Sequence, residues 1–362
     1  MNMKFFLKTL SVFFVLTLLV SCGNADDDVN LDLNTGDGLG KGQEVDDCLG
    51  LEQGDLVLSI QEQFTTLPGK VSVFFRVSDT SGNPVPGLTA NKFTIYEQGR
   101  NDDCFKTIST SESSARISPN SQIFSNNTLL VLDLSNSVLS SSLDELKLAS
   151  TSFIDAVMST TSQESVKMAI YWFDGEDNLH LLNELTPSKS ELIAAIDGIT
   201  NTISNDPSTD LYGAVIKATD IASDLVKKST AGGKIGAASV VIFTDGTDQA
   251  SRYTEDAALK KVKEANANIS FFSIGLGAEI DTQVLTAIGK TASVFAQNKD
   301  ELERTFRDIS EKVSERANSY YLFEYCSPKR DGSGENNLAI ELNTGSRQGA
   351  VQTKFNASGF TG

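Results

Sequence analysis

The sequence predicts an α/β domain with a doubly wound, mostly parallel sheet, inserted into a β-sandwich that the two flanking segments build together. Three observations lead to this fold class. Over residues 125–317, short apolar segments alternate with helical stretches, which is typical of a parallel sheet with helices on both faces. Before and after that stretch, apolar residues recur at every second position, as in antiparallel strands. The last segment has too few strands to be stable alone, so we expect both flanks to share one sandwich.

The composition of the 362-residue chain limits what the protein can bind. It has 48 acidic against 30 basic side chains, and the net charge of -18 argues against nucleic acid or an anionic membrane surface, because those are held by clustered Lys and Arg. One His and four Cys exclude a site built from several imidazoles, and no two Cys have zinc-finger spacing. Hard cations with oxygen ligands remain compatible with this composition.

Residues 1–21 are typical of a secretion signal. Lys4 and Lys8 precede an apolar run over 10–20 that is too short to span a membrane. The run ends in Leu-Val-Ser-Cys, which resembles the lipobox of bacterial lipoproteins, and the resemblance implies that Cys22 becomes the lipidated N-terminus. A plain signal peptide with an incidental Cys22 is the alternative. We expect a lipid-anchored protein of the bacterial cell envelope, at the outer membrane, with its exposure on the cell surface left open.

Residues 22–54 are expected to form a flexible acidic tether. They are rich in Gly, Asn and Asp, and their scattered apolar residues cannot bury enough surface to become ordered. The acidic run at 26–28 looks like the surface-export signal of some lipoproteins, and a solvated linker is an equal alternative. A segment at 32–43 echoes a calcium loop, but its glycine is misplaced and it ends in Gln43 in place of Glu, so we assign it to the linker.

The first part of the sandwich is expected over 55–124 and the second over 318–362. The segments with a period of two are 56–60, 71–77, 93–95, 321–325, 338–342 and 351–355. Turn signals at 80–84 and 86–87 interrupt the early pattern where a hairpin or a sandwich corner would fall. The stretch over 75–97 loosely resembles a small sandwich found ahead of surface adhesion domains.

The inserted domain over 125–317 repeats strand and helix. Apolar strands are expected at 129–132, 166–173, 239–243, 269–274 and 293–295, with an edge strand near 179–182. Helices are expected at 143–158, 189–199, 211–226, 254–267, 282–288 and 301–316. Ser and Asp residues ahead of several helices are suitable N-caps.

Three short segments of the inserted domain carry the candidate chemistry. The sequence DLSNS at 133–137 follows the first strand and precedes a helix, Thr209 lies at another helix start, and Asp245 ends a later strand. The Asp-x-Ser-x-Ser pattern alone is a weak signal, but the three segments in this order and context are specific. In an open α/β sheet, sites form beyond the carboxyl ends of strands where the strand order reverses, and both Asp133 and Asp245 are expected there.

In order, spacing and context, residues 125–317 resemble the von Willebrand factor type A domain with its metal-ion-dependent adhesion site. The sequences YWFDG at 171–175 and FFSIGLG at 271–277 also look like that family. The resemblance implies that two carboxylates and three hydroxyls surround one divalent cation, and these belong to Asp133, Ser135, Ser137, Thr209 and Asp245. One departure is that Thr209 follows Asp-Pro-Ser at 206–208, where glycines are usual in the family.

Hydroxyl and carboxylate oxygens suit Mg²⁺, with Mn²⁺ or Ca²⁺ as alternatives. Two carboxylates and three neutral hydroxyls only just balance a divalent charge, so the cation remains attractive to one further anionic oxygen. We expect a partner protein to supply this oxygen from an Asp or Glu side chain. The alternative is a set of capping residues around a helix start that binds no metal.

Other candidate sites have less support. His180 lies in the edge-strand pattern with no second His and no nearby Cys, so we assign it no role. No spare His is available for a Ser-His-Asp triad, and the motifs of serine hydrolases, phosphate loops and zinc proteases do not occur. Gly275 and Gly277 lack the rest of a dinucleotide fingerprint, and Trp172 fits the core better than a stacking platform.

The cysteines predict one disulfide. Cys48, Cys104 and Cys326 meet an oxidising compartment after export, which predicts one bond and one remaining thiol. If both flanks form one sandwich, Cys104 and Cys326 can be neighbours. We therefore expect a bond between these two, with a pair that includes Cys48 as the alternative.

The function that follows from these expectations is a non-catalytic, divalent-cation-dependent module for protein binding or adhesion. The alternative is an assembly or scaffold subunit of the envelope that holds a neighbouring subunit with the same site. A metal-dependent hydrolase has little support, because neither a nucleophile nor a general base beyond the metal carboxylates can be named.

Overall fold

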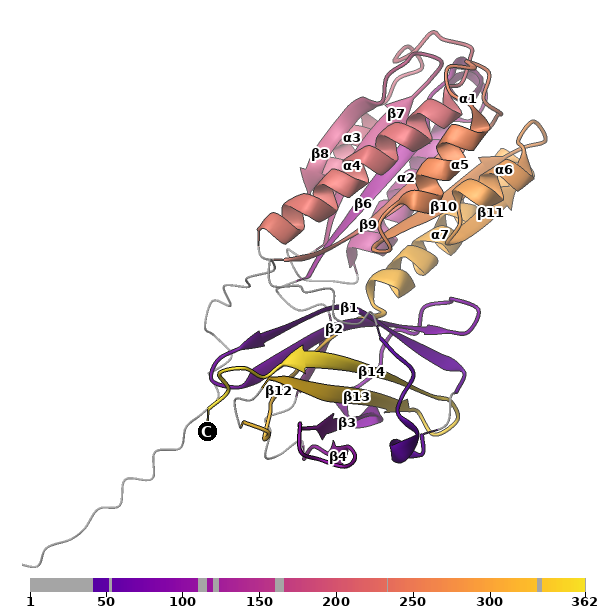
Figure 1. Ribbon diagram of the computed structural model, residues 1–362. Helices are drawn as coiled ribbons and strands as arrows, with labels where there is room; N and C mark the ends of the chain where they lie inside the picture. The colour runs from indigo at the N-terminus through magenta and orange to yellow at the C-terminus, as the bar shows by residue number, and fades with distance from the viewer. Residues whose placement is uncertain are drawn as a thin grey trace, which may run out of the picture.

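A computed structural model describes residues 42–51, 54–109, 116–119, 124–159, 166–232, 234–330 and 334–361. The expected signal segment, Cys22 and the tether up to residue 41 lie outside the described residues. The α/β domain stands above a β-sandwich in Figure 1, and we call these two bodies the inserted domain and the sandwich. Within the described residues, no helix combines the length and the apolar character needed to cross a bilayer.

The inserted domain contains a six-stranded sheet. Its strands are β6 (Phe124–Asp133), β7 (Val166–Phe173), β8 (His180–Thr186), β9 (Ile235–Thr244), β10 (Ile269–Leu276) and β11 (Ala292–Ala296). Their order across the sheet is β11, β10, β9, β6, β7, β8, and every neighbouring pair is parallel except β7 with the edge strand β8. The predicted doubly wound, mostly parallel sheet is confirmed.

Helices cover both faces of this sheet (Figure 1). One face carries α1 (Asn136–Ser141), α2 (Leu143–Ser159), α3 (Lys189–Asp197) and α7 (Leu302–Ala317), the last preceded by η4 (Lys299–Glu301). The other face carries α4 (Leu211–Ala231), α5 (Glu255–Glu264) and α6 (Thr282–Ile288). The alternation of side chains along β6 explains the two layers, because Leu130 and Leu132 pack with the first group while Leu129 and Val131 pack with the second.

The sandwich consists of two antiparallel four-stranded sheets. One sheet contains, in spatial order, β1 (Leu56–Thr66), β2 (Lys70–Asp79), β12 (Tyr320–Cys326) and β5 (Arg116–Pro119). The other contains β14 (Gln348–Asn356), β13 (Glu335–Asn343), β3 (Phe93–Gln98), which follows η3 (Ala90–Lys92), and β4 (Lys106–Thr107). Strand β12 pairs with β2 and β5, and β13 pairs with β3, so each sheet combines strands from both flanks. This pairing confirms that the flanks share one sandwich.

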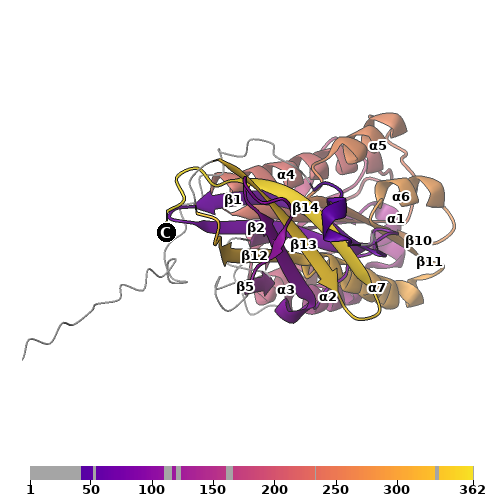
Figure 2. The same ribbon diagram turned by 60° about the horizontal axis from the view of Figure 1, so that its bottom comes forward.

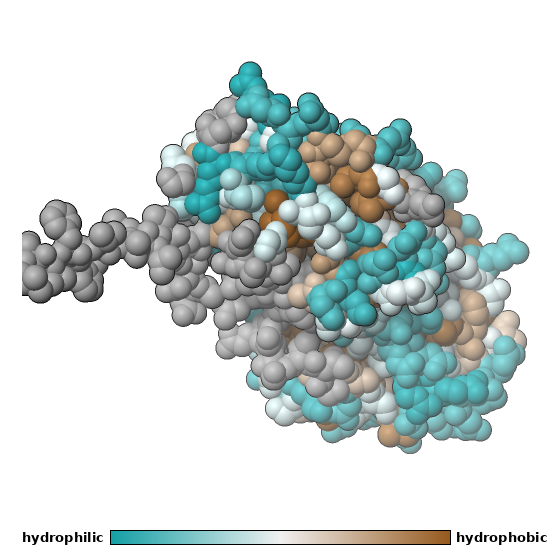
Figure 3. All heavy atoms as spheres, turned by 90° about the horizontal axis from the view of Figure 1, so that it is seen from below, coloured by the Kyte–Doolittle hydropathy of each residue, from teal (hydrophilic) through white to brown (hydrophobic). Residues whose placement is uncertain are grey.

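The sandwich holds its own core between its two sheets, which cross in front of the inserted domain in Figure 2. Aromatic and branched side chains of β2, β12 and β13 fill it, including Phe75, Tyr321 and Ile340, all without accessible surface. On the face of the molecule seen in Figure 3, hydrophilic residues predominate and hydrophobic residues form small separate groups.

A buried apolar cluster joins the two bodies. It combines Phe74 of β2 and Tyr320 and Leu322 of β12 with Ile235 and Ala237 at the start of β9. The rings of Phe74 and Tyr320 are stacked, with centroids 5.5 Å apart. Because neighbouring residues of a strand point to opposite faces, Phe74 points outward from the sheet whose other face holds the sandwich core. The inserted domain therefore rests on the outer face of this sheet.

The disulfide differs from the expected one. Cys48 is bonded to Cys104, with Cα atoms 5.9 Å apart. The expected bond between Cys104 and Cys326 is therefore wrong, and the alternative pair that includes Cys48 forms. The expected remaining thiol is wrong as well, because Cys326 is also disulfide-bonded and no described cysteine is free.

The reason lies in the segment 42–51, which we had assigned to the tether. Gln43 and Gln352 of β14 exchange backbone hydrogen bonds of 2.7 and 3.1 Å, and the Asp46 amide donates to the Gln352 side chain at 2.9 Å. This anchoring carries the short helix η2 (Asp47–Leu49), and with it Cys48, to the loop between β3 and β4. The composition of the segment gave no sign of this contact.

A carboxylate is buried in the sandwich. Glu97 of β3 has no accessible surface and accepts hydrogen bonds from the Tyr325 hydroxyl at 3.1 Å, the Ser327 hydroxyl at 2.6 Å and the Asn336 amide at 3.0 Å. Burial raises the pKa of Glu97 above its usual value, and the three hydrogen bonds oppose this shift.

Removal of the disulfide should destabilise the sandwich selectively. The bond closes a loop of 56 residues, so the double variant Cys48→Ser/Cys104→Ser should lose about 4 kcal/mol of unfolding free energy in the chain-entropy treatment. Urea unfolding followed by circular dichroism measures this loss. Fluorescence of Trp172, the only tryptophan, reports on the inserted domain. The unfolding transition seen by this fluorescence should shift less than the transition seen by circular dichroism. An equal shift of both signals would contradict a role confined to the sandwich.

Glu97 should make the stability of the sandwich depend on pH. Because its folded pKa is raised, its protonated form stabilises the fold, and this contribution is lost as the pH rises from about 4.5 through the raised pKa. The Glu97→Gln variant should therefore gain unfolding free energy relative to the unaltered protein over this range, by about 1.4 kcal/mol for each pKa unit of the shift. Urea titrations at several pH values measure the difference. If the difference in unfolding free energy between the variant and the unaltered protein does not change with pH, Glu97 does not have a raised pKa.

Candidate functional site

The strand order places the ends of β6 and β9 side by side. The chain runs from β6 outward to β7 and β8, and then returns to β9 on the opposite side of β6. Connections that leave toward opposite faces open a crevice at this point of the sheet. The register pairs Leu132 with Phe243, so Asp133 and Asp245 follow neighbouring strands at the same edge.

Asp133 is held in a fixed orientation by two donors. It ends β6 with no accessible surface, and its Oδ1 accepts from the Ser135 amide at 2.9 Å. Its Oδ2 accepts from the Thr244 hydroxyl of β9 at 2.7 Å. Thr244 was not among the expected site residues, because a Thr inside an apolar strand carries no recognisable motif.

A chain of oxygen atoms connects the first loop to Asp245. The Ser135 and Ser137 hydroxyls lie 3.2 Å apart, and the Ser137 hydroxyl donates to Asp245 Oδ1 at 3.0 Å. Ser135 precedes helix α1, but its side chain makes no capping hydrogen bond with a backbone amide of the helix. The capping interpretation therefore fails for Ser135.

The two carboxylates repel each other in a poorly solvated place. Burial is the main cause that raises the pKa of Asp133 to about 7, and the nearby charge of Asp245 raises it further against the hydrogen bonds. Burial also raises the pKa of Asp245, with a smaller contribution from Glu279. No basic side chain of the described residues is among the causes that lower either pKa. A divalent cation would relieve this repulsion.

Thr209 lies on the same side of the crevice as Asp245. It is buried, and its carbonyl accepts from the amides of Gln249 and Ala250 at 2.9 and 3.1 Å. Its Oγ1 is 4.0 Å from the position that a Cβ would take on Gly246, directly after Asp245. The structure thus brings the third predicted segment to the other two.

The loop before Thr209 is held without the glycines that are usual in the resembling family. Asp206 accepts from the Ser208 amide at 2.8 Å and hydroxyl at 2.6 Å, and the Asp206 carbonyl accepts from the Asn136 amide at 2.9 Å. A glycine lies instead on the facing loop, at position 175. A Cβ at this position would be only 1.8 Å from the Ser208 hydroxyl. Glycine permits this close approach of the two loops because it has no Cβ.

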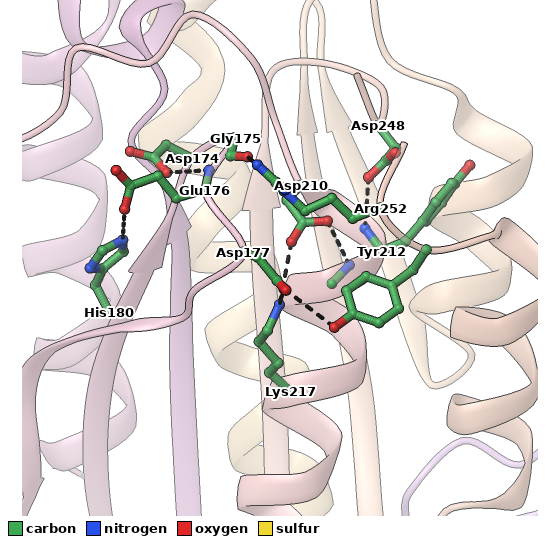
Figure 4. Close-up of polar contacts among 12 residues, drawn as sticks. Asp174, Gly175, Glu176, Asp177, His180, Asp210, Tyr212, Lys217, Asp248 and Arg252 are labelled. Atoms are coloured by element: carbon green, nitrogen blue, oxygen red, sulfur yellow. Dashed lines mark hydrogen bonds and ion pairs between the residues drawn. The ribbon is translucent and has the colours of Figure 1, made fainter. Parts of the chain in front are cut away.

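Charged residues brace the loops around the crevice, and Figure 4 shows them. Arg252 donates two hydrogen bonds, of 3.0 and 2.8 Å, to the Gly175 carbonyl. Lys217 of α4 lies between Asp177 at 2.6 Å and the buried Asp210 at 3.3 Å. These positioning residues are far apart in the sequence, so only the folded chain reveals them.

The geometry of the oxygen set fits a divalent cation. Adjacent ligands of an octahedral Mg²⁺ with bonds near 2.0–2.1 Å lie roughly 2.9 Å apart. The observed separations of 3.2 Å between Ser135 and Ser137 and 3.0 Å between Ser137 and Asp245 are close to this value. They are also ordinary hydrogen-bond distances, so a cation could replace the hydrogen bonds with little movement of the chain.

A search of solved structures found several chains that resemble this one. A von Willebrand factor type A domain structure from Catenulispora acidiphila is 9% identical, with a TM-score of 0.44, and the match covers 84% of this chain and 74% of that one. Proximal thread matrix protein 1 from the mussel byssus, described with a zinc-occupied MIDAS motif, is 15% identical, with a TM-score of 0.42 and coverage of 59% and 50%. The corresponding domain of the type V pili tip protein Mfa5 from Porphyromonas gingivalis is 13% identical, with a TM-score of 0.40 and coverage of 53% and 96%. No curated protein matches the chain significantly.

The family model for the von Willebrand factor type A domain matches residues 127–312. The matched stretch is half of the chain, and it begins in β6 and ends in α7. It therefore contains all five of the oxygen-bearing residues described above. The chain belongs to the von Willebrand factor type A domain family.

Proposed function

We propose that the protein is a lipid-anchored component of the bacterial cell envelope that binds a protein ligand through a divalent cation, without catalysis. The observation that supports this most is a pair of carboxylates, the buried Asp133 and the partly buried Asp245, whose charge acts on Asp133 while no basic side chain of the described residues is among the causes that lower either pKa. Buried charges of one sign are unfavourable unless a counter-charge compensates them. A metal ion is the counter-charge that this geometry supports.

The proposed cation is Mg²⁺, with Mn²⁺ or Ca²⁺ as alternatives. Its ligands would be the side-chain oxygens of Asp133, Ser135, Ser137, Thr209 and Asp245. Hard oxygen donors and the absence of a nitrogen or sulfur donor in this set favour a hard cation. When bound, the ion would supply a positive charge at the rim of an otherwise acidic domain.

The proposed ligand is a protein that presents an Asp or Glu side chain. Its carboxylate would reach the cation from the open side of the crevice, where Ser137 is exposed. Such a charge-assisted contact at the centre of an interface would dominate the affinity, while the surrounding loops would select the partner. The loops concerned are 174–178, 205–208 and 247–252.

The source of the ligand can be tested directly. Purified chain is incubated with extracellular-matrix proteins, with whole cells and with envelope extracts, each with and without EDTA. Metal-dependent binding to matrix or cells supports adhesion. Metal-dependent binding only to a component of its own envelope supports the alternative, an assembly or scaffold subunit.

The Asp245→Ala variant should bind Mg²⁺ about 100-fold more weakly or not at all, since one carboxylate would remain against a divalent charge. Its fold should persist, because Asp245 lies at the rim of the sheet and its loss relieves the repulsion on Asp133. Calorimetry with Mg²⁺ and Mn²⁺ measures the affinity, and thermal unfolding without metal checks the fold.

Asp144→Ala is the matched control for this experiment, because it removes an exposed carboxylate from the first turn of α2. It should leave the cation affinity unchanged. If the unaltered protein binds neither cation at millimolar concentration, the proposed metal centre is wrong.

Lipidation of Cys22 is a separate expectation. Mass spectrometry of the processed protein should find an acylated Cys22 at the N-terminus, and cell fractionation should find the protein with membranes. Cys22→Ser should release it into the soluble fraction. An unmodified N-terminus at residue 23 or later would contradict lipid anchoring, and protease treatment of intact cells would show whether the protein faces outward.

A further inference from the structure

Three potential metal ligands outside the proposed metal centre meet beside the Thr209 loop. They are Asp174 and Glu176, from the loop after β7, and His180, which begins β8 (Figure 4). Each offers one ligand atom, and the three atoms lie within 4.8 Å of one another. None of the three belongs to the oxygen set described above.

The imidazole of His180 is fixed from two sides. Its ring stacks on Trp172, with centroids 3.9 Å apart and planes within 10°. Its Nδ1 lies 3.2 Å from the side-chain amide of Asn178. An amide can be turned so that its oxygen accepts from Nδ1–H, and this arrangement leaves Nε2 free to bind a cation.

The other ring nitrogen has no hydrogen-bond partner. His180 Nε2 is shielded from solvent, and its nearest acidic atom, Glu176 Oε2, lies 3.6 Å away, which is too long for a hydrogen bond. A buried nitrogen without a partner is unusual in a folded protein and calls for an explanation. A cation between Nε2 and the two carboxylates would provide one.

Asp174 is the buried member of the group. It is 3% exposed, and its oxygens accept from the Ser204 hydroxyl at 2.5 Å and from the Glu176 amide at 2.9 Å. Each carboxylate oxygen keeps a further lone pair for a metal. The three side chains line a surface hollow of about 690 Å³ together with Trp172 and residues 203–207, so water or a ligand can complete a coordination shell.

We propose that Asp174, Glu176 and His180 form a second metal site, which takes a borderline divalent cation such as Zn²⁺. One imidazole and two carboxylates are a common ligand set for Zn²⁺, whereas Mg²⁺ prefers oxygen ligands alone. The two centres would thus differ in the cation they select.

The second site would act on the first through the loop that they share. The Asp174 carbonyl accepts from the Asp210 amide at 2.8 Å, directly after Thr209, and Gly175 lies against Ser208. A cation on Asp174 and Glu176 would hold this loop in place. Residues 205–208 border both centres, so the second cation would also shape the surface that meets a ligand.

The test uses the fact that His180 is the only histidine of the chain. The full chain without a histidine tag, carrying Asp245→Ala so that the first centre does not compete, is labelled with ¹⁵N and titrated with Zn²⁺. The Nε2 signal of His180 should move to the position of a metal-bound nitrogen and saturate at one equivalent. Mg²⁺ alone should leave it in place.

Two variants on the same background identify the ligands. Glu176→Gln should weaken Zn²⁺ binding by about tenfold or more. Glu184→Gln removes an exposed charge from the same strand as His180 and should have no effect. His180→Phe keeps a ring on Trp172 but removes the nitrogen, so calorimetry should show the loss of the Zn²⁺ equivalent.

The proposal is overturned if millimolar Zn²⁺ leaves the Nε2 signal unmoved, or if Glu176→Gln and Glu184→Gln respond alike. In the first case, the contact of Nε2 with Glu176 at 3.6 Å accounts for this nitrogen without a metal. Both outcomes are independent of the first centre, because the titration is done without Asp245.

Discussion

Repulsion between the buried carboxylate of Asp133 and the partly buried carboxylate of Asp245 is the constraint around which the inserted domain is arranged. Neighbouring parallel strands deliver Asp133 and Asp245 to one edge of the sheet, where little water can screen them. Hydrogen bonds from the hydroxyls of Thr244 and Ser137 stabilise the two carboxylates and offset part of the repulsion. If the proposed cation binds here, the domain would be more stable with it than without it, and metal binding and folding would be thermodynamically linked.

The sandwich gives this domain a firm support. The chain enters the inserted domain after β5 and leaves it into β12, and these two strands are hydrogen-bonded neighbours. The apolar cluster around Phe74 and Tyr320 fills the space between the sheet and the start of β9. Two adjacent attachments and a buried contact restrict the freedom of one body relative to the other more than a single linker would.

Much of this organisation follows from patterns within the sequence, and the exceptions have physical reasons. Apolar strands such as β9 can be recognised in the sequence as continuous apolar runs, because both of their faces are buried. The short strands β4 and β5 and helix α1 have too few residues to display a period. The Cys48 bond was missed because the anchoring of Gln43 on β14 depends on backbone hydrogen bonds, which any sequence can make. Gly175 and Thr244 gained their roles only from neighbours that lie far away along the chain.

The Cys48–Cys104 bond also decides how the molecule would carry mechanical load. A pull between the top of the inserted domain and the segment 42–51 passes from Cys48 directly to Cys104, and then through β4 and β5 into the inserted domain. The 55 residues between the two cysteines, with β1, β2 and β3, are bypassed by a covalent link. Tension therefore cannot unfold these strands one after another. The segment between the two cysteines, which would be roughly 190 Å long when extended, does not lengthen under load.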